Sequence, residues 1–358
     1  MKVALVHDDL VQWGGAERVL HALTGIFPDA SIFTSLFDKQ HPILKNKFRE
    51  KHIHTSFLQK IPGKKALYKA FLPLYPLAFE QFDLSSYDLV ISHTTRFAKA
   101  IITRHDQVHI CYCHTPPRFL WNFPSDNLPK MLDPLFNYLR LYDQIISKRI
   151  NSFIAGSFNA QSRIKKIYGQ NAFVLQPFVD FSELEGFENF DGGYFLVISR
   201  LNKYKNVDIV VNTFKLKNAK LKIIGIGPEF GKLKQLTDNS QNIEFLGAVS
   251  ENLRLSLLAG CKALIVAAEE DFGLTPLEAQ ALGKPVIALK KGGALETVVE
   301  NETGVFFDTL SVLSLEKALK KFEGMDFKTE KCINNAKRFS KENFVKNLKD
   351  ILENLGLI

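Results

Sequence analysis

Short apolar runs alternate with amphipathic stretches along almost the whole chain. Runs typical of buried strands occupy Val3–Val6, Asp88–Ser92, His109–Cys113 and Ser152–Ala155 in the first half, and Tyr194–Ser199, Leu221–Gly225, Ile243–Leu246, Ala263–Ala267 and Pro285–Leu289 in the second. Helical periodicity occupies Ala16–Ile26, Asn159–Ile167, Val207–Phe214, Glu251–Ala259, Thr275–Leu282 and Ser314–Phe322. Strands that alternate with helices predict right-handed βαβ units, and therefore parallel sheets with helices on both faces.

The length predicts two such α/β domains, since 358 residues are far more than the roughly 150 of one domain. We expect the boundary near Gln176–Asp180, because the following residues, 183–193, are acidic and loop-like. A last amphipathic helix is predicted over Phe339–Leu355. In parallel sheets of this kind, ligands bind at the carboxyl ends of the strands.

Composition narrows the class of protein. No apolar run approaches the roughly 18 residues of a membrane span, and the first apolar run is too short for a signal peptide. The four cysteines have neither metal-ligand nor disulfide-framework spacing, which indicates a cytoplasmic, reduced protein.

The positive charge is confined to one half of the chain. Residues 1–175 carry 22 Lys and Arg against 13 Asp and Glu, a net charge of +9, whereas the remainder carries 24 against 25. The first half is therefore expected to face an anionic partner. A nucleic-acid-binding protein is one hypothesis, but the basic residues form no nucleic-acid motif, so we expect no nucleic-acid partner.

Two carboxylates flank a turn in the second half. Glu270 follows the predicted strand Ala263–Ala267 and should lie at its carboxyl end. The stretch from Thr275 to Glu278 is typical of a helix start, with Thr275 as the N-cap and Glu278 as a capping-box acid. A purely structural role for Glu278 therefore stays open beside a binding role.

The turn between these acids suggests a ligand. Phe272, Gly273, Leu274 and Thr275 would expose backbone amides at the positive end of a helix, which is an anion site. Carboxylates beside an anion site are useful when they bind hydroxyl groups. A diphosphate flanked by two polyols meets both demands, and a sugar nucleotide is such a ligand.

Cations for a diphosphate follow another predicted strand. Arg200 and Lys205 lie on the loop after Tyr194–Ser199, and Lys203 is an alternative to Lys205. Such cations stabilise a leaving diphosphate. The chain has no Asp-x-Asp pair, so we predict no metal site and no cofactor.

Three further features are weaker. Gly14 and Gly15 lie between a predicted strand and helix, where glycine lets the backbone approach a phosphate or sugar. Gly227 follows the strand Leu221–Gly225 and is interpreted as part of a turn near the base or ribose. His114 follows the strand His109–Cys113 and is a candidate sugar contact, with His7 and His93 as weaker candidates.

Together these residues resemble the retaining GT-B glycosyltransferases of family four. That family has two glutamates separated by seven residues, with Phe-Gly-Leu between them and Ala-x-Ala-x-Gly-x-Pro-Val-Ile after them. The same pattern runs here from Glu270 through Glu278 to Ile287, and a Gly-Gly-x-x-Glu loop follows at 292–296. The stretch His114–Trp121 is similar to a subset that includes bacterial mannosyltransferases of surface-polysaccharide assembly, such as lipopolysaccharide.

The resemblance implies two Rossmann-like, doubly wound domains that face each other across a cleft. Residues 1–177 would bind the acceptor, residues 178–338 the nucleotide sugar, and residues 339–358 would form a helix that crosses back to the first domain. The implied activity is the transfer, with retention and without metal, of a hexosyl group. GDP-mannose is the favoured donor and a UDP-sugar the next, and a glycan or polyprenyl-linked saccharide is the acceptor.

The resemblance also implies a role for each candidate residue. Glu278 would bind the ribose, and Glu270 with the backbone of Phe272–Thr275 would hold the donor sugar. Arg200 and Lys205 would stabilise the departing diphosphate, which Gly15 approaches from the first domain. His114 would contact the transferred sugar. A sugar-nucleotide epimerase of the same architecture is the alternative function.

The basic first half has a place in this scheme. Residues 57–79 mix aromatic residues, leucines and lysines. They could seat the first domain on an anionic membrane leaflet, at the inner face of the membrane. A core helix with a solvated basic edge explains the same composition, and both interpretations stay open.

Overall fold

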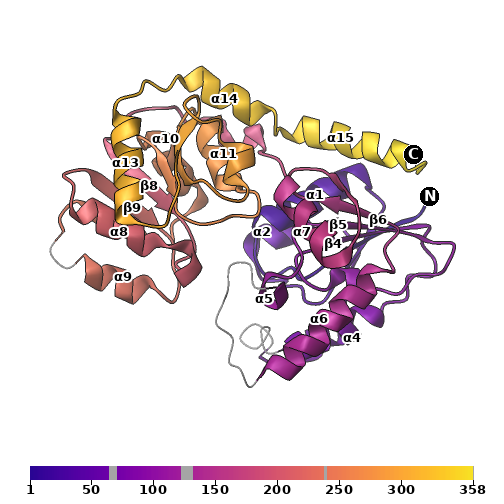
Figure 1. Ribbon diagram of the computed structural model, residues 1–358. Helices are drawn as coiled ribbons and strands as arrows, with labels where there is room; N and C mark the ends of the chain where they lie inside the picture. The colour runs from indigo at the N-terminus through magenta and orange to yellow at the C-terminus, as the bar shows by residue number, and fades with distance from the viewer. Residues whose placement is uncertain (64–70, 122–131, 238–239, 358) are drawn as a thin grey trace. The chain divides into compact units, whose positions relative to one another are not determined.

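The chain divides into two compact units. Unit 1 comprises Met1–Pro177 with Val345–Ile358, and unit 2 comprises Phe178–Phe344. The computed structural model (Figure 1) describes residues 1–63, 71–121, 132–237 and 240–357.

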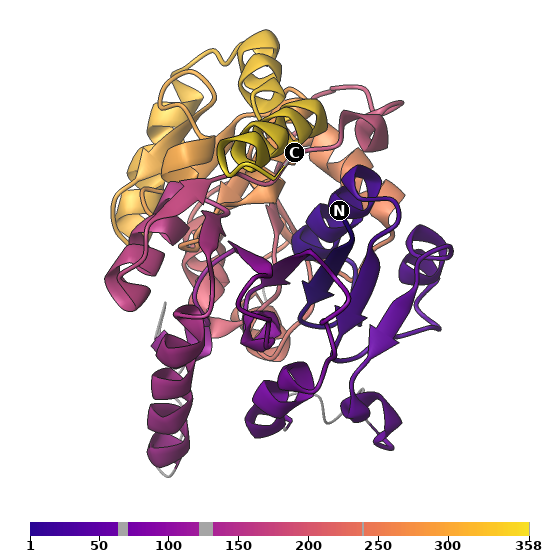
Figure 2. The same cartoon turned by 90° about the vertical axis from the view of Figure 1, so that its right-hand side faces the viewer.

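Unit 1 is built on a parallel sheet with the strand order β3-β2-β1-β4-β5-β6-β7. Its strands are β1 Val3–His7, β2 Ser31–Thr34, β3 Ile53–Thr55, β4 Leu89–Thr94, β5 Val108–Cys113, β6 Ser152–Ala155 and β7 Ala172–Val174. Its helices are α1 Gly15–Ile26, α2 Pro42–Lys47, α4 Tyr75–Glu80, α5 Arg118–Trp121, α6 Asp133–Ser147 and α7 Phe158–Tyr168, with short 3₁₀ helices η1 Phe57–Lys60, η2 Leu72–Leu74 and η3 Ala98–Ala100. Figure 2 shows its first strands side by side in indigo and violet.

Unit 2 repeats the plan with a parallel sheet of order β10-β9-β8-β11-β12-β13. Its strands are β8 Tyr194–Ile198, β9 Lys220–Ile224, β10 Ile243–Gly247, β11 Leu264–Val266, β12 Val286–Leu289 and β13 Gly304–Phe307. Its helices are α8 Val207–Lys215, α9 Phe230–Leu236, α10 Glu251–Gly260, α11 Leu274–Ala281, α12 Ala294–Thr297, α13 Val312–Glu323 and α14 Thr329–Lys337, with 3₁₀ helices η5 Phe181–Leu184 and η6 Lys203–Lys205. Helix α15, Lys341–Asn354, begins in unit 2 and continues in unit 1.

The strand order of both sheets confirms the predicted fold class. Each sheet starts at an inner strand, adds two neighbours on one side and then reverses to the other side, as in a Rossmann fold. The reversal lies between β1 and β4 in unit 1, and between β8 and β11 in unit 2. Ligand sites of such sheets lie outside the carboxyl ends of the strands beside this reversal.

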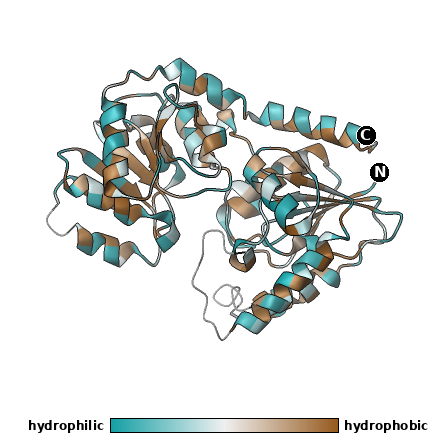
Figure 3. Ribbon diagram, viewed as in Figure 1, coloured by the Kyte–Doolittle hydropathy of each residue, from teal (hydrophilic) through white to brown (hydrophobic). Residues whose placement is uncertain are grey.

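Burial on both sheet faces explains why the strands are so apolar. All five residues of β1 and all six of β4 are buried. Unit 2 holds one cluster around Phe195, Phe214 and Phe307 and another around Leu258, Leu277 and Phe339. Figure 3 shows the same pattern, with apolar strands inside and helices such as α13 and α14 hydrophilic on their outer faces.

The sequence pattern missed the shorter strands. Strands β2, β3, β7 and β13, each of three or four residues, were not predicted. The predicted terminal helix begins two residues later than expected, at Lys341, because α14 is a separate helix before it. Among the described residues, no helix has both the length and the apolar character needed to span a bilayer.

Candidate active site

Two loops are held together at the carboxyl ends of β8 and β9 in unit 2. The amide of Leu201 donates to the carbonyl of Ile226 at 2.9 Å. A Cβ on Gly225 would overlap the carbonyl oxygen of Ser199, and one on Gly227 would overlap that of Leu201. These glycines therefore let the β9 loop pack directly on the β8 loop, which carries the exposed Arg200.

The short helix η6 brings a cation to the β11 loop. Lys205 forms an ion pair with Glu270, and both side chains are partly buried. Asn206, which adopts a left-handed φ of 51°, donates from Nδ2 to the carbonyl of Ala267 at 3.0 Å. This bond ties η6 to the end of β11, and so brings the segment that carries Lys205 beside the loop that carries Glu270. Lys203, the alternative cation, is exposed.

The turn after Glu270 is braced by the loop after β12. The amide of Gly293 donates to the carbonyl of Glu270 at 2.8 Å. A Cβ on Gly293 would overlap the carbonyl of Phe272, so only glycine permits this approach. The turn then reaches Gly273, whose φ of 99° favours glycine, and helix α11 begins at Leu274.

The expected cap of this helix is wrong. The N-cap of α11 is Gly273, it makes no side-chain cap hydrogen bond, and Thr275 is already the second helical residue. The left-handed turn at Gly273 starts the helix two residues earlier than the Thr-Pro pattern predicts. Glu278 therefore stands one turn inside α11 and is not a capping-box acid.

Glu278 is held by an arginine that the sequence did not indicate. Arg254 on α10 donates from Nη1 to Oε2 of Glu278 at 2.7 Å and from Nη2 to Oε1 of Glu251 at 2.6 Å. Burial opposes the charge on Arg254, but the hydrogen bonds to Glu251 and the charge of Glu278 outweigh it and raise the pKa of Arg254. Glu278 itself is only 5% exposed, so its carboxylate is fixed in place.

In unit 1, the glycine pair opens helix α1. Gly15 is the first residue of α1 and Gly14 is its N-cap. The amide of Gly14 donates to Oε2 of Glu17 at 2.8 Å, so a buried carboxylate anchors the loop.

Three histidines form a chain across the carboxyl ends of the neighbouring strands β1, β4 and β5. His7 ends β1, His93 lies in register beside it on β4, and His114 follows β5. The Nδ1 atoms of His7 and His93 are 2.9 Å apart, and the Nε2 atoms of His93 and His114 are 2.7 Å apart. Burial, and then the charges of His114 and His7, hold the pKa of His93 well below its usual value. Burial and the charge of His7 lower that of His114 to about 4.

Asp8 organises the loop after β4. Its carboxylate accepts from the amides of Thr95, Arg96, Phe97 and Ala98 at 2.7, 2.9, 2.9 and 2.8 Å. These bonds and the nearby Arg96 outweigh the cost of burial and lower the pKa of Asp8.

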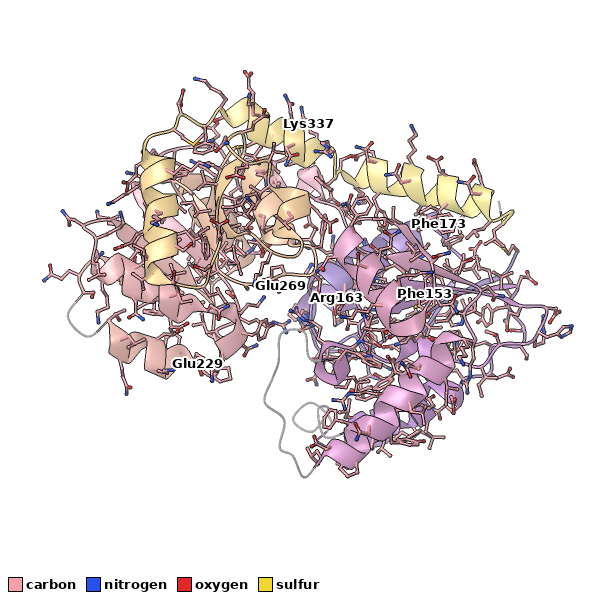
Figure 4. All side chains as sticks on the ribbon, in the orientation of Figure 1. Phe153, Arg163, Phe173, Glu229, Glu269 and Lys337 are labelled. Carbon is pink, nitrogen blue, oxygen red and sulfur yellow. The ribbon has the colours of Figure 1, made fainter. Side chains whose placement is uncertain are left out.

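Sequence reasoning missed Asp8, Glu17, Arg96 and Arg254. Asp8 stands directly after the first strand, so the rule that selected Glu270 would have selected it too. Arg254 had no signal, because it comes from the middle of a helix. Arg163 on α7, labelled in Figure 4, donates to Thr115 Oγ1 at 3.3 Å and was also missed. Among the described residues, no group of three or more His, Cys, Asp or Glu side chains is arranged to hold a metal ion.

Comparison with known proteins gives these sites a context. Residues 183–339 match the family described as glycosyl transferases group 1. The chain is similar to the alpha-1,3/1,6-mannosyltransferase ALG2 of Mus musculus, with 26% identity over 89% of this chain and 87% of the relative. The ALG2 of Saccharomyces cerevisiae is 26% identical over 83% of this chain and 71% of its own.

Solved structures share the whole fold. The lipopolysaccharide outer core galactosyltransferase WaaB superposes with a TM-score of 0.73 at 16% identity, covering 99% of both chains. The HepE protein of Anabaena, in complex with UDP, superposes with a TM-score of 0.72 at 18% identity, covering 99% of this chain and 100% of that one. At such identities the likeness shows the GT-B fold, and it agrees with the strand order of both sheets.

Proposed function

We propose that this chain, a glycosyltransferase of the GT-B fold, is a retaining, metal-independent mannosyltransferase. Its residues 183–339 belong to the glycosyl transferases group 1 family. Its donor is GDP-mannose, and its acceptor is a glycan or a polyprenyl-linked saccharide. The ALG2 relatives are mannosyltransferases, and this chain matches them over most of their length, which supports a mannosyl group. A UDP-sugar is the second candidate, supported by the UDP complex of HepE.

The observation that carries the proposal is the Lys205–Glu270 pair beside the start of α11. The β8 loop supplies Arg200, η6 supplies Lys205, and the turn from Phe272 to Thr275 supplies backbone amides at the positive end of a helix. We assign the diphosphate to these groups, and the ammonium of Lys205 would turn from Glu270 to the phosphate when the donor binds. We assign Gly15 to the same diphosphate.

The two glutamates would bind hydroxyl groups on either side of the diphosphate. Glu278 is held by Arg254 through Oε2, and its carboxylate would accept from the ribose hydroxyl groups. Glu270 would hold the donor sugar once Lys205 has moved to the phosphate. We assign His114 to the same sugar.

The chemistry needs no protein nucleophile in this assignment. The C1–O bond to the diphosphate breaks while the acceptor hydroxyl oxygen bonds to C1 from the same face, and its proton passes to the departing phosphate oxygen. Arg200 and Lys205 stabilise the charge that grows on that phosphate. Removal of one such group costs on the order of 10²–10³ in rate.

A pocket in unit 1 is suited to a saccharide acceptor. It has a volume of about 280 Å³ and lies beyond the carboxyl ends of β1 and β2, lined by Val11, Leu36, Phe37, Asp38, Lys39, Gln40 and Gln59. Amide, carboxylate and ammonium groups next to an aromatic ring are the chemistry that binds sugars. We assign it to the acceptor.

An anionic membrane surface is the remaining proposed partner. Of the segment 57–79, residues 64–70 lie outside the described part, while Phe71, Tyr75 and Phe79 belong to the core of unit 1. Leu74 and Leu77 are exposed, as are Tyr138, Leu141 and Ile145 on α6. Helices α4 and α6 are joined by a 3.0 Å hydrogen bond from Tyr142 to Glu80. Leu74 ends η2, directly before α4, so these apolar residues lie on neighbouring segments. Flotation with anionic vesicles, but not with neutral ones, is expected.

The deciding experiment measures nucleotide binding by thermal shift. GDP and GDP-mannose are expected to stabilise the protein more than UDP and UDP-sugars, and the shift should disappear in Arg200→Ala and Lys205→Ala. Lys203→Ala is the matched control, because Lys203 lies on the same helix and is exposed. Equal shifts in the Lys203 and Lys205 variants would contradict the diphosphate assignment.

The epimerase alternative is not favoured. The relatives that match most of this chain are transferases. If the protein converted a sugar nucleotide into its epimer and transferred no sugar to any acceptor, the epimerase function would be supported instead.

A further inference from the structure

The three histidines of unit 1 form a directional chain. A neutral imidazole has one N–H donor and one acceptor nitrogen. His93 uses Nδ1 towards His7 at 2.9 Å and Nε2 towards His114 at 2.7 Å. If one ring changes tautomer, the other two must change with it, because otherwise two lone pairs or two N–H groups would face each other.

A buried carboxylate sets the direction of this chain. Oε2 of Glu17 accepts from the Gly14 amide at 2.8 Å, and Oε1 lies 3.8 Å from Nε2 of His7. Glu17, His7 and His93 are each no more than 3% exposed, so water screens this charge little. The carboxylate favours an N–H over a lone pair on the nitrogen that faces it. His7 is therefore protonated on Nε2, His93 on Nδ1 and His114 on Nε2.

The far end of the chain is the other nitrogen of His114. In this arrangement Nδ1 of His114 carries a lone pair. A Cβ at position 156 would lie 3.4 Å from this nitrogen, so Gly156 leaves space beside it.

We infer that Glu17 is a positioning residue that acts through His7 and His93 to fix the tautomer of His114, so that His114 Nδ1 accepts a hydrogen bond from a hydroxyl group of the bound sugar. The inference deepens the proposed function and rests on it for the identity of the ligand. The tautomer itself belongs to the free protein and is independent of any ligand.

One substitution reverses the chain. In Glu17→Gln the amide oxygen must accept from Gly14, which turns the NH₂ group towards His7 Nε2. That nitrogen then becomes an acceptor, His7 donates from Nδ1, His93 donates from Nε2, and His114 is left with its proton on Nδ1. The side chain keeps its size, so packing is not changed.

The test is ¹⁵N NMR of the histidine rings in the full-length protein without ligand at pH 8, above the ordinary histidine pKa of about 6.5. In the wild type, His114 Nδ1 is expected to resonate as an unprotonated ring nitrogen, and in Glu17→Gln as a protonated one. His109→Gln is the control, because His109 lies on β5 and bonds to Ser92, outside the chain. A protonated Nδ1 in the wild type, or the same tautomer in both proteins, overturns the inference.

A second variant covers a failure of Glu17→Gln to fold. His93→Leu cuts the chain at its middle, so His114 is expected to populate both tautomers; a single unchanged tautomer overturns the inference. In the transfer assay, Glu17→Gln should lower kcat/KM for the donor about tenfold. A reversed tautomer with unchanged kcat/KM would overturn the sugar contact while leaving the glycosyltransferase assignment untouched. Loss of all nucleotide binding in the wild type would instead refute the proposed function.

Discussion

Arg254 holds Glu278 through a 2.7 Å hydrogen bond between Nη1 and Oε2. The two residues come from different helices, α10 and α11, so the bond holds the Glu278 carboxylate on α11 in place against α10. Arg254→Ala is expected to lower the unfolding free energy by about 3 kcal/mol, because it takes the guanidinium away from a buried carboxylate. Donor affinity should fall about tenfold as Glu278 loses its fixed position, and calorimetric titration with GDP would measure this.

The control variant changes the other carboxylate that Arg254 contacts. Glu251→Gln removes the other carboxylate charge from Arg254, but Glu251 is half exposed. The pair between Arg254 and Glu278 remains, so donor affinity should stay within about twofold of the wild type and stability within about 0.5 kcal/mol. A large loss of affinity here would mean that the whole network, and not Glu278, sets donor binding.

Gly293 allows a close backbone approach in the candidate donor site. Gly293→Ala would force its Cβ into the carbonyl of Phe272 and push the turn away from the loop after β12. We expect stability to fall by about 2 kcal/mol or more. Because the same turn is proposed to present its amides to the diphosphate, GDP binding should weaken with it. Denaturant unfolding and GDP titration measure the two effects.

Gly231 on helix α9 provides the matched substitution for Gly293. No atom lies within 4 Å of a Cβ built there, and the residue is helical. Gly231→Ala is expected to stabilise the protein by about 0.5–1 kcal/mol, since alanine is the better helix former. If both alanine variants lost the same stability, the close approach at Gly293 would not be the cause.

Stability should fall in mild acid because buried histidines remain neutral. Burial lowers the pKa of His109 to about 3, and burial with the charge of His7 lowers that of His114 to about 4, against about 6.5 in the unfolded chain. The unfolded state therefore binds more protons between these values, and the stabilisation is complete above pH 6.5 and lost as the pH falls. From pH 6.5 to 5, each histidine should cost about 2 kcal/mol.

Urea titrations at several pH values would show this dependence. His109→Gln should flatten the slope between pH 6.5 and 5, because one of the histidines that protonate only on unfolding is gone. The carboxylates of Asp8 and Glu17, whose pKa values are lowered in the folded protein, act only at lower pH. A stability that is unchanged down to pH 5 would show that these histidines are protonated in the folded protein.

The sequence was informative where one short stretch carries both the element and its chemistry. Strand β11, Glu270 and the turn to Gly273 are consecutive, so alternation and glycine placement predicted a polar group at a strand end. The same reasoning selected the loop that carries Arg200 and Lys205. The fold class followed in the same way, from strands buried on both faces that read as continuous apolar runs.

Contacts between distant segments were beyond such reasoning. Arg254 reaches Glu278 over 24 residues, and His7 reaches His93 over 86. Nothing local marks such pairs, because their proximity depends on how the helices and strands pack in the folded unit. The predicted N-cap of α11 was wrong for a different reason. The left-handed Gly273 starts the helix before the Thr-Pro pattern that usually marks a helix start.

A buried ion pair in unit 1 offers the last prediction. Lys99 Nζ lies 2.7 Å from Asp143 Oδ1, and neither side chain is exposed to solvent. Asp143 also accepts from Trp121 Nε1 at 2.8 Å and from the Tyr168 hydroxyl at 2.7 Å. Lys99→Met should therefore cost about 3–5 kcal/mol, because it leaves the carboxylate buried without a cation.

The double variant Lys99→Met with Asp143→Leu should recover part of this loss, since no uncompensated charge remains. Recovery should stay incomplete, because Trp121 and Tyr168 then keep buried donors without an acceptor, which costs about 1–3 kcal/mol for each group. Guanidinium unfolding of the wild type, both single variants and the double variant gives the coupling energy directly. Strictly additive losses would mean that the two charges do not stabilise each other, and that the hydrogen bonds to Asp143 alone hold α6 in place.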